Sequence, residues 1–168
     1  PEFKVNVNLS YVQIIKSSIL DEIKQALKDY NLKLALLGIE VTESGYLENT
    51  YHYKKLWSTL KEEGITLILD DYGTGYSNAY RLSNLTPHYI KIDRVLTQKA
   101  LSSNYERSIL IYIIEMAHSL KLKVCIEGVE TEEELQEIKK LNPDYIQGYL
   151  FGKPASEDEF YNQQIKKK

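Results

Sequence analysis

The chain has 168 residues, 43% hydrophobic and 27% charged, with a formal net charge of −3. This length suits one domain with a real core, and the acidic balance excludes the basic surface that binding a nucleic-acid polymer requires. No apolar run approaches the roughly 18 residues of a membrane span, and no signal peptide is visible. We therefore expect a cytoplasmic location with no membrane contact from this segment. Cys125 is the only cysteine, which excludes intramolecular disulfides and cysteine-rich zinc sites.

Short apolar runs alternate with amphipathic stretches along the chain. The runs predict strands at residues 4–9, 34–41, 65–69, 89–92, 123–126 and 145–147. Several are apolar throughout, as in parallel strands that are buried on both faces. Helices are predicted from Ser18 to about residue 30 and at residues 47–63, 77–85 and 105–120. The sequences that begin at Ser18, Thr131 and Ser156 are typical of capping boxes, which start helices.

Six β–α repeats indicate either a doubly wound sheet or a barrel. No strand is followed by Gly-x-Gly-x-x-Gly, which disfavours a dinucleotide-binding sheet. A closed barrel takes eight strands and about 250 residues, and six strands alone would leave two open parallel edges. We therefore expect a TIM-like (β/α) barrel that is incomplete here, with about six of its β–α units. About two strands and roughly 80 residues would precede Pro1 in a longer protein. The only methionine, Met116, agrees with that expectation.

Polar side chains recur where the predicted strands end. Each strand brings an oxygen ligand or a lysine to its carboxyl end, in the order Asn8, Glu40, Asp70 with Asp71, Lys91 with Asp93, Glu127 and Gln147. In a barrel this end is the active-site face. Each residue also has an ordinary structural explanation: an Asp pair before glycine is most often a turn or a helix cap, and Glu40 could simply pair with Lys91. Six such coincidences at successive strand ends are improbable, so we interpret the set as one site.

The chemistry of this site follows from its donor atoms. Carboxylate and amide oxygens without sulfur favour Mg²⁺ or Mn²⁺ over zinc or copper. Adjacent aspartates repel each other unless cations neutralise them, and a bridging carboxylate could hold two metals about 3.5–4 Å apart. Such a pair activates water and stabilises an in-line phosphoryl displacement. Lys91 can orient or deprotonate the water and screen charge in the transition state.

A glycine-rich loop follows the two aspartates. Gly73 and Gly75 bracket Thr74, which permits positive φ and a close approach to phosphate or to a metal-bound carboxylate. A tight strand-to-helix turn explains the same residues, and the two explanations are compatible.

The sequence Asp70-Asp71-Tyr72-Gly73-Thr74-Gly75-Tyr76-Ser77 resembles the Asp-Asp-Phe-Gly-Thr-Gly-Tyr-Ser loop of EAL domains, the bacterial phosphodiesterases for cyclic di-GMP. The resemblance covers nearly the whole chain, so we interpret residues 1–168 as a single EAL-type domain that is truncated at its N-terminus. Further matching segments, in family order, are Val7-Asn8-Leu9-Ser10, Glu40-Val41-Thr42-Glu43, Ile90-Lys91-Ile92-Asp93-Arg94, Glu127-Gly128-Val129-Glu130-Thr131 and Gln147-Gly148-Tyr149-Leu150-Phe151.

The resemblance implies roles for individual residues. Metal ligands would be Asn8, Glu40, Asp70, Asp71, Glu127 and Gln147. Asp70 would bridge two metals, and Lys91, Glu127 and Glu40 would carry the catalysis, with Lys91 acting on the nucleophilic water. Glu43 matches the glutamate that holds the loop of Gly73, Thr74 and Gly75 in place. The family reaction opens cyclic di-GMP to linear 5′-pGpG with Mg²⁺ or Mn²⁺, and Ca²⁺ inhibits it.

Departures from the family pattern concern a few positions. Tyr72 replaces the usual Phe, and Ile126 stands where Ala is common. The Glu-Ala-Leu signature is absent, and with it a glutamate that binds the first metal.

The resemblance also implies partners: a homodimer, and a sensory or GGDEF-type domain in the longer protein, which can itself be membrane-anchored. Two other interpretations stay open. The chain could be a catalytically inactive EAL-like domain that senses cyclic di-GMP or binds proteins, or it could be another two-metal hydrolase on the same barrel.

Overall fold

The computed structural model describes residues 3–10, 12–13, 18–42, 50–73, 82 and 85–162. Its strands are β1 (Val5–Asn8), β2 (Leu37–Thr42), β3 (Thr66–Tyr72), β4 (Tyr89–Ile92), β5 (Lys123–Ile126) and β6 (Tyr145–Ile146). Its helices are α2 (Ile19–Asp29), α3 (Thr50–Glu62), α5 (Arg94–Ser102), α6 (Asn104–Ser119), α7 (Glu132–Lys139) and α8 (Glu157–Phe160), and η1 (Leu34–Leu36) is a short 3₁₀ turn.

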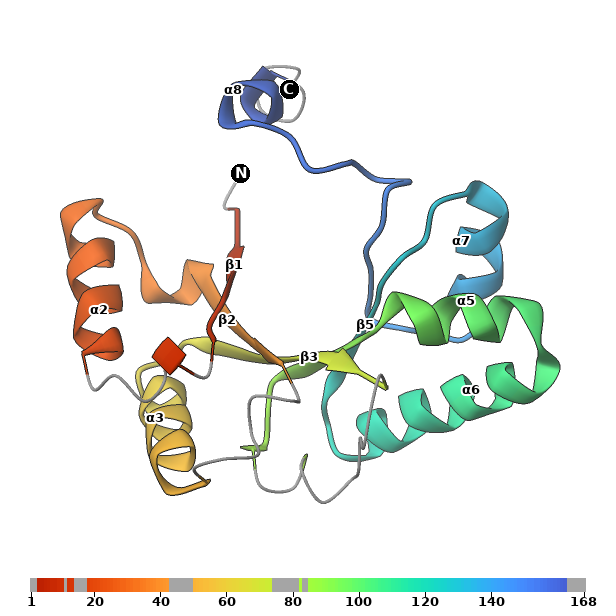
Figure 1. Ribbon diagram of the computed structural model, residues 1–168, viewed down its shortest axis with the longest axis horizontal. Coiled ribbons are helices and arrows are strands. Elements are labelled where there is room, and N and C mark those ends of the chain that lie inside the picture. The colour runs from red at the N-terminus through yellow and green to blue at the C-terminus, as the bar shows by residue number, and fades with distance from the viewer. Residues whose placement is uncertain are drawn as a thin grey trace.

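The six described strands form one parallel sheet in the order β1-β2-β3-β4-β5-β6. Chain order and sheet order coincide, as they do when right-handed β–α units follow one another around a barrel. Figure 1 shows α2 and α3 on one flank of the sheet and α5, α6 and α7 on the other. The predicted incomplete barrel is therefore confirmed as a six-stranded half-barrel.

Strict alternation along the strands separates the core from the barrel interior. In β2 to β5, the aliphatic residues that pack under the helices are at most 2% exposed: Ile39, Val41, Leu67, Leu69, Ile90, Ile92, Val124 and Ile126. The residues between them point to the opposite face of the sheet. Glu40, Asp70 and Lys91 occupy this second face, and each is still less than 9% exposed. The fold thus collects charged groups on the concave side.

The helix boundaries agree closely with the sequence patterns. Capping boxes at Thr131 and Ser156 are confirmed, since each hydroxyl accepts the N3 amide and each N3 glutamate accepts the cap amide. The capping box at Ser18 is wrong: its hydroxyl makes no cap bond and instead donates to Glu22 Oε1 at 2.7 Å. The predicted helix at residues 77–85 lies almost entirely outside the described residues.

The start of β2 and the presence of α5 differ from the sequence-based expectation for local reasons. The second strand begins at Leu37, because residues Leu34–Leu36 first make a 3₁₀ turn. Helix α5 was not predicted, because only Asp93 separates it from the end of β4. Asp93, which we had placed among the polar strand ends, caps this helix by accepting the Val95 amide at 2.7 Å.

The edges of the half-barrel are exposed. Val5 and Val7 of β1 are 58% and 45% exposed, and Tyr145 of β6 is 46% exposed. The segment after β6 crosses toward the other edge, where Phe160 of α8 packs edge-on against Phe3 with ring centroids 6.0 Å apart. Figure 1 shows α8 beside the amino-terminal end of the chain.

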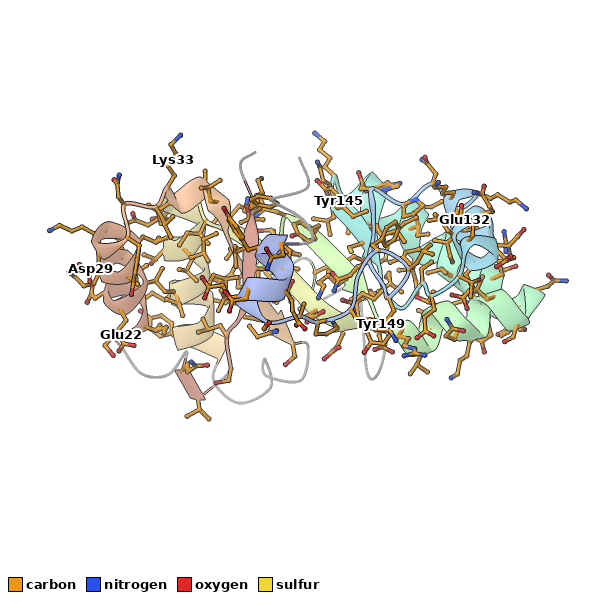
Figure 2. The ribbon with its side chains drawn as sticks, turned by 90° about the horizontal axis from the view of Figure 1, so that it is seen from above. Glu22, Asp29, Lys33, Glu132, Tyr145 and Tyr149 are labelled. Carbon is orange, nitrogen blue, oxygen red and sulfur yellow. The ribbon has the colours of Figure 1, made fainter. Side chains whose placement is uncertain are left out.

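Charged side chains cover the outside of the helices, with Glu22, Asp29 and Lys33 on one flank and Glu132 on the other (Figure 2). None of the described helices has the length and apolarity that crossing a membrane requires.

Candidate metal centre at the strand ends

A break in the pairing of β3 and β4 places the two adjacent aspartates. Leu69 pairs with Ile90 and Tyr72 with Ile92, so β3 carries one extra residue between these pairs. Asp71 takes a positive φ of 57° at this bulge, and its amide donates to Asp70 Oδ1 at 3.0 Å. In a regular strand consecutive side chains point to opposite faces, whereas a bulge re-aims one of them. Both carboxylates can therefore serve one site.

Lys91 links a carboxylate of β2, one of β3 and that of Glu127, which directly follows β5. Its Nζ lies 3.0 Å from Glu40 Oε2, 3.1 Å from Asp70 Oδ1 and 2.7 Å from Glu127 Oε1. Only 7% of the lysine side chain is exposed, so these contacts are weakly screened by solvent. The pair of Glu40 and Lys91 expected as an ordinary ion pair does exist, but it is one part of a larger cluster.

The charges in this cluster are unbalanced. One ammonium faces Glu40, Asp70 and Glu127, with Asp71 close by. Burial raises the pKa of Asp71, and repulsion from Asp70 and Asp93 raises it further. Burial likewise raises the pKa of Glu127, although Lys91 opposes that change. Both upward shifts follow first from burial and then from the neighbouring carboxylates, which disfavour a further negative charge.

The pKa of Lys91 is also raised, but for a cation a raised pKa favours the charged form. Burial alone would lower its pKa, but the hydrogen bond and charge of Glu127, together with Glu40 and Asp70, outweigh burial and raise it. Lys91 is therefore protonated at neutral pH in this arrangement.

The donor set fits a divalent cation. One carboxylate oxygen from each of Asp70, Asp71 and Glu127 lies within 4.8 Å of the others. Hard oxygen donors with excess negative charge suit Mg²⁺, Mn²⁺ or Ca²⁺. Glu40 reaches the same cluster through Lys91, and Asn8 pairs in register with Glu40 across β1 and β2.

Gln147 reaches the site because a glycine follows it. The backbone amide of Gln147 donates to Ile126 O at 2.8 Å, which ties Gln147 to the end of β5 just before Glu127. A side chain at Gly148 would place Cβ 2.0 Å from Val129 O, so only glycine lets these two segments approach. Gln147 itself lines two cavities near the strand ends and is exposed.

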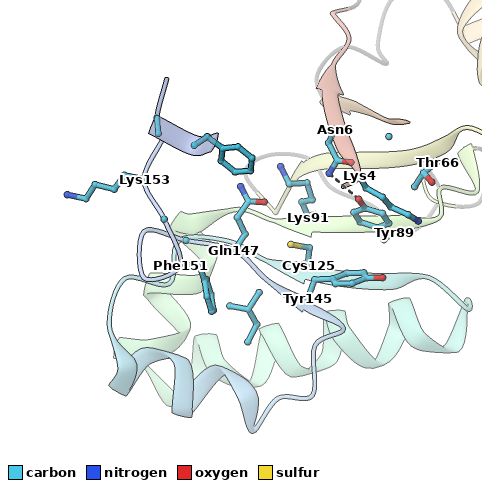
Figure 3. A pocket seen from close by; sticks show the side chains of 16 residues that line it. Lys4, Asn6, Thr66, Tyr89, Lys91, Cys125, Tyr145, Gln147, Phe151 and Lys153 are labelled. Atoms are coloured by element: carbon cyan, nitrogen blue, oxygen red, sulfur yellow. Dashed lines mark hydrogen bonds between the residues drawn. The ribbon is translucent and has the colours of Figure 1, made fainter. Parts of the chain in front are cut away.

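The concave face of the half-barrel encloses a cavity of about 560 Å³. Lys91 and Gln147 line it at the carboxyl end, and Asn6 and Tyr89 lie deeper, joined by a hydrogen bond of 3.1 Å (Figure 3). Cys125 also faces this cavity, where burial raises the pKa of its thiol to about 12, so the thiol is protonated at neutral pH.

The structure thus brings together most of the predicted site residues. Glu40, Asp70, Asp71, Lys91 and Glu127 form one cluster, with Asn8 and Gln147 at its edges. Gly73 follows the bulge with a φ of 105°, as expected for the start of the loop. Three predicted loop residues, Glu43, Thr74 and Gly75, lie outside the described residues.

Two features that shape the site were not anticipated from the sequence. In the sequence, the bulge at Asp71 is indicated only by two polar residues in succession at the end of an apolar strand. The close approach at Gly148 has as its signal a glycine directly after a polar strand end. Neither signal is specific, because both occur in ordinary turns.

Known proteins resemble this chain in sequence and in structure. The family model described as "EAL domain" matches residues 1–154. The cyclic di-GMP phosphodiesterase NbdA of Pseudomonas aeruginosa is 36% identical over 151 residues, which cover 90% of this chain and 19% of that protein. The chain spans about a fifth of the length of the curated relatives it matches.

Solved structures of the same kind superpose closely. The PaMucR phosphodiesterase in complex with c-di-GMP has a TM-score of 0.85 and 30% identity, covering 94% of this chain and 64% of that one. The manganese and cy-diGMP complex of Klebsiella pneumoniae BlrP1 at pH 9.0 has a TM-score of 0.86 and 26% identity, covering 92% of this chain and 40% of that one. The half-barrel, its strand-end carboxylates and these matches agree: the chain belongs to the EAL domain family.

Proposed function

We propose that this chain contributes the catalytic centre of a metal-dependent phosphodiesterase that opens cyclic di-GMP to linear 5′-pGpG. The observation that carries the proposal is the cluster of Asp70, Asp71 and Glu127, whose oxygens lie within 4.8 Å of one another beside Lys91. Two similar proteins support the proposal. NbdA is named a cyclic di-GMP phosphodiesterase, and BlrP1 is described as a complex with manganese and cy-diGMP.

The proposed ligands are Asn8, Glu40, Asp70, Asp71, Glu127 and Gln147. Mg²⁺ or Mn²⁺ bound there would activate water and stabilise an in-line displacement at phosphorus. Asp70 and Asp71 offer adjacent carboxylates, so one of them can serve two cations. Ca²⁺ prefers longer bonds and more ligands than Mg²⁺, which supports the expectation that it occupies the site without supporting turnover.

Lys91 is proposed to orient the nucleophilic water and to screen the charge that develops on the phosphate. Its protonated ammonium is a hydrogen-bond donor, which suits both tasks. Glu40 and Glu127 hold that ammonium from two sides at 3.0 and 2.7 Å. Loss of Glu40 would remove a proposed metal ligand and one anchor of Lys91 together.

The second candidate is an EAL-like domain that binds cyclic di-GMP without cleaving it. The observation in its favour is the exposure of both sheet edges, with Val5 of β1 58% exposed and Tyr145 of β6 46% exposed. A barrel left open at these edges would hold the cluster less rigidly than catalysis demands. The same edges support the proposal that the chain acts with further strands as one EAL-type domain.

The experiment compares product formation with binding. Cyclic di-GMP is incubated with Mn²⁺ and either the wild-type protein, in its longest available form, or Glu40→Ala, and the products are separated by chromatography. We expect 5′-pGpG from the wild type and none from the variant. Unchanged turnover in Glu40→Ala contradicts the assigned site. Calorimetry that detects cyclic di-GMP binding in the wild type without any pGpG favours the sensor.

The proposed homodimer, an additional sensory or GGDEF-type domain and a cytoplasmic location stay predictions from the family resemblance.

A further inference from the structure

A second cavity lies at the opposite ends of the strands, away from the carboxylates. Its volume is about 480 Å³. Tyr89, Lys123 and Tyr145, which line it, are the first residues of β4, β5 and β6, and Lys4 directly precedes β1. Lys4, Tyr89 and Tyr145 also line the larger cavity on the concave face, which Figure 3 draws with these three residues at the end away from Lys153. The amino-end cavity therefore adjoins the larger cavity on the concave face, and among the described residues no strand-end carboxylate lines it.

The residues that line the amino-end cavity carry positive charge only. Four lysines supply this charge, Lys4, Lys61, Lys121 and Lys123, beside the neutral His88, and among the described residues no aspartate or glutamate contributes to the wall. The chain as a whole has a formal charge of −3, so this concentration runs against its overall composition. Like charges around one cavity repel each other, and an anion between them would relieve that repulsion.

Contacts within the chain do not neutralise these lysines. In the part of the chain that the structure describes, none of the four makes an ion pair. Lys61 Nζ donates to the carbonyl and hydroxyl oxygens of Thr86 at 3.2 and 2.9 Å. Lys123 Nζ donates to the Tyr145 hydroxyl at 3.0 Å and lies 5.3 Å from that ring's centroid. Neutral partners leave the ammonium charges available to a ligand.

Helix ends explain the positions of two of the four lysines. Lys61 lies in the last turn of α3, and Lys121 follows the end of α6, where cations offset the carbonyl ends of helices. This explanation does not extend to Lys4 and Lys123, which lie on or beside strands. Asp144 acts electrostatically on Lys123, but its carboxylate already accepts bonds from the Val124 amide at 2.8 Å and from His118 at 2.9 Å.

The same wall supplies a neutral donor and an aromatic surface. The Leu67 amide donates to His88 Nδ1 at 2.9 Å, so the remaining ring nitrogen of neutral His88 carries the hydrogen. Tyr89 and Tyr145 stand side by side with ring centroids 5.7 Å apart. Aromatic faces of this kind stack on planar rings regardless of their substituents.

We propose that the amino-end cavity binds a small phosphate ester that carries a planar ring, such as a nucleoside monophosphate. The lysines would hold the phosphate, and the Tyr89 and Tyr145 pair would hold the ring. The volume of about 480 Å³ lies within the range of small-molecule sites. Nothing in this proposal depends on the metal centre or on cyclic di-GMP hydrolysis.

The test is calorimetric titration of the 168-residue chain with AMP and, separately, with inorganic phosphate, at low salt with EDTA present. EDTA removes divalent cations, so the strand-end carboxylates cannot hold the phosphate. The test variant Lys4→Gln/Lys121→Gln removes two charges from the cavity wall. The control Lys28→Gln/Lys99→Gln removes two exposed charges elsewhere, and amide spectra confirm that both variants keep the fold.

We expect saturable binding of AMP that weakens about tenfold or more in Lys4→Gln/Lys121→Gln and less than about twofold in the control, because charged hydrogen bonds are lost only in the former. We also expect AMP to bind more tightly than inorganic phosphate, and Tyr145→Leu to remove that difference. Titrations that do not saturate, or equal weakening in the two double variants, overturn the proposal. Equal affinities for AMP and phosphate overturn the assignment of a ring.

Discussion

The ammonium of Lys91 lies 2.7 Å from Glu127 Oε1, and the two side chains come from the carboxyl ends of the neighbouring parallel strands β4 and β5. The same ammonium contacts Glu40 and Asp70. One cation from the chain therefore holds carboxylates that would otherwise repel each other. A divalent metal at the same oxygens would share this task, which makes Lys91 both a stabiliser of the metal-free site and a neighbour of the metal.

Replacing Lys91 by methionine tests the first of these roles. Lys91→Met leaves three carboxylates without their cation, and breaking a buried ion pair costs about 3–5 kcal/mol of unfolding free energy. We expect urea denaturation in EDTA to show a loss of this size. Lys99→Met, on the exposed side of α5, is the control and should change the unfolding free energy by less than about 0.5 kcal/mol. Similar losses in both variants would show that the cluster does not depend on Lys91.

Added Mn²⁺ should raise the melting temperatures of the wild type and of Lys91→Met by different amounts. Because Mn²⁺ can neutralise the carboxylates that Lys91→Met exposes, we expect Mn²⁺ to raise the melting temperature of this variant more than that of the wild type. A smaller rise in the variant would indicate that the cation binds elsewhere.

Gly148 permits the approach that brings Gln147 to the site. A Cβ there would lie 2.0 Å from Val129 O, whereas a Cβ at Gly152 would meet nothing within 4 Å. We expect Gly148→Ala to lower the unfolding free energy by about 1–3 kcal/mol, since backbone must shift to make room. The matched variant Gly152→Ala should stay within about 0.5 kcal/mol of the wild type. Denaturation curves that cannot tell the two variants apart would contradict the close contact.

Acid should weaken the contacts of Asp144. Burial by itself raises its pKa, but the hydrogen bonds from the Val124 amide and from His118 together outweigh burial and lower the pKa below its usual value. A carboxyl with a lowered folded-state pKa stabilises the fold fully above its unfolded pKa of about 3.9, and loses that contribution as the pH falls through the folded pKa.

The measurement is the unfolding free energy of wild type and Asp144→Asn between about pH 5 and pH 3. We expect the advantage of the wild type to be constant at the upper end of this interval and to shrink below about pH 4. An advantage that grows toward pH 3 would reverse the assigned direction of the pKa change.

Much of this fold could be predicted because buried parallel strands are recognisable in a sequence as short apolar runs. Two strands were placed with correct boundaries, at Tyr89–Ile92 and Lys123–Ile126, since each is a short and mainly apolar run. The order of polar residues at the strand ends was sufficient to predict a shared site. Position along a strand fixes which end a residue occupies, and every parallel strand has its carboxyl end at the same edge.

The details of the site depended on backbone geometry that no periodicity reveals. Asp70 and Asp71 share a site through a bulge, and alternation alone would have sent their side chains to opposite faces. Asp93 was grouped with the strand ends, but its carboxylate caps α5 because the helix begins at the next residue. The charge of Lys91 also needed structure, since its pKa depends on three carboxylates that are distant in sequence.

The central claim is that the strand-end carboxylates bind a divalent cation, and the most direct test is paramagnetic broadening of backbone amide signals by Mn²⁺. At substoichiometric Mn²⁺ we predict selective loss of the amide signals of Asp71 and Glu127, while those of Lys123 and Tyr145 at the opposite strand ends persist. Broadening centred instead on Glu132 and Glu133, the exposed glutamates at the start of α7, or no selective broadening at all, would contradict the claim.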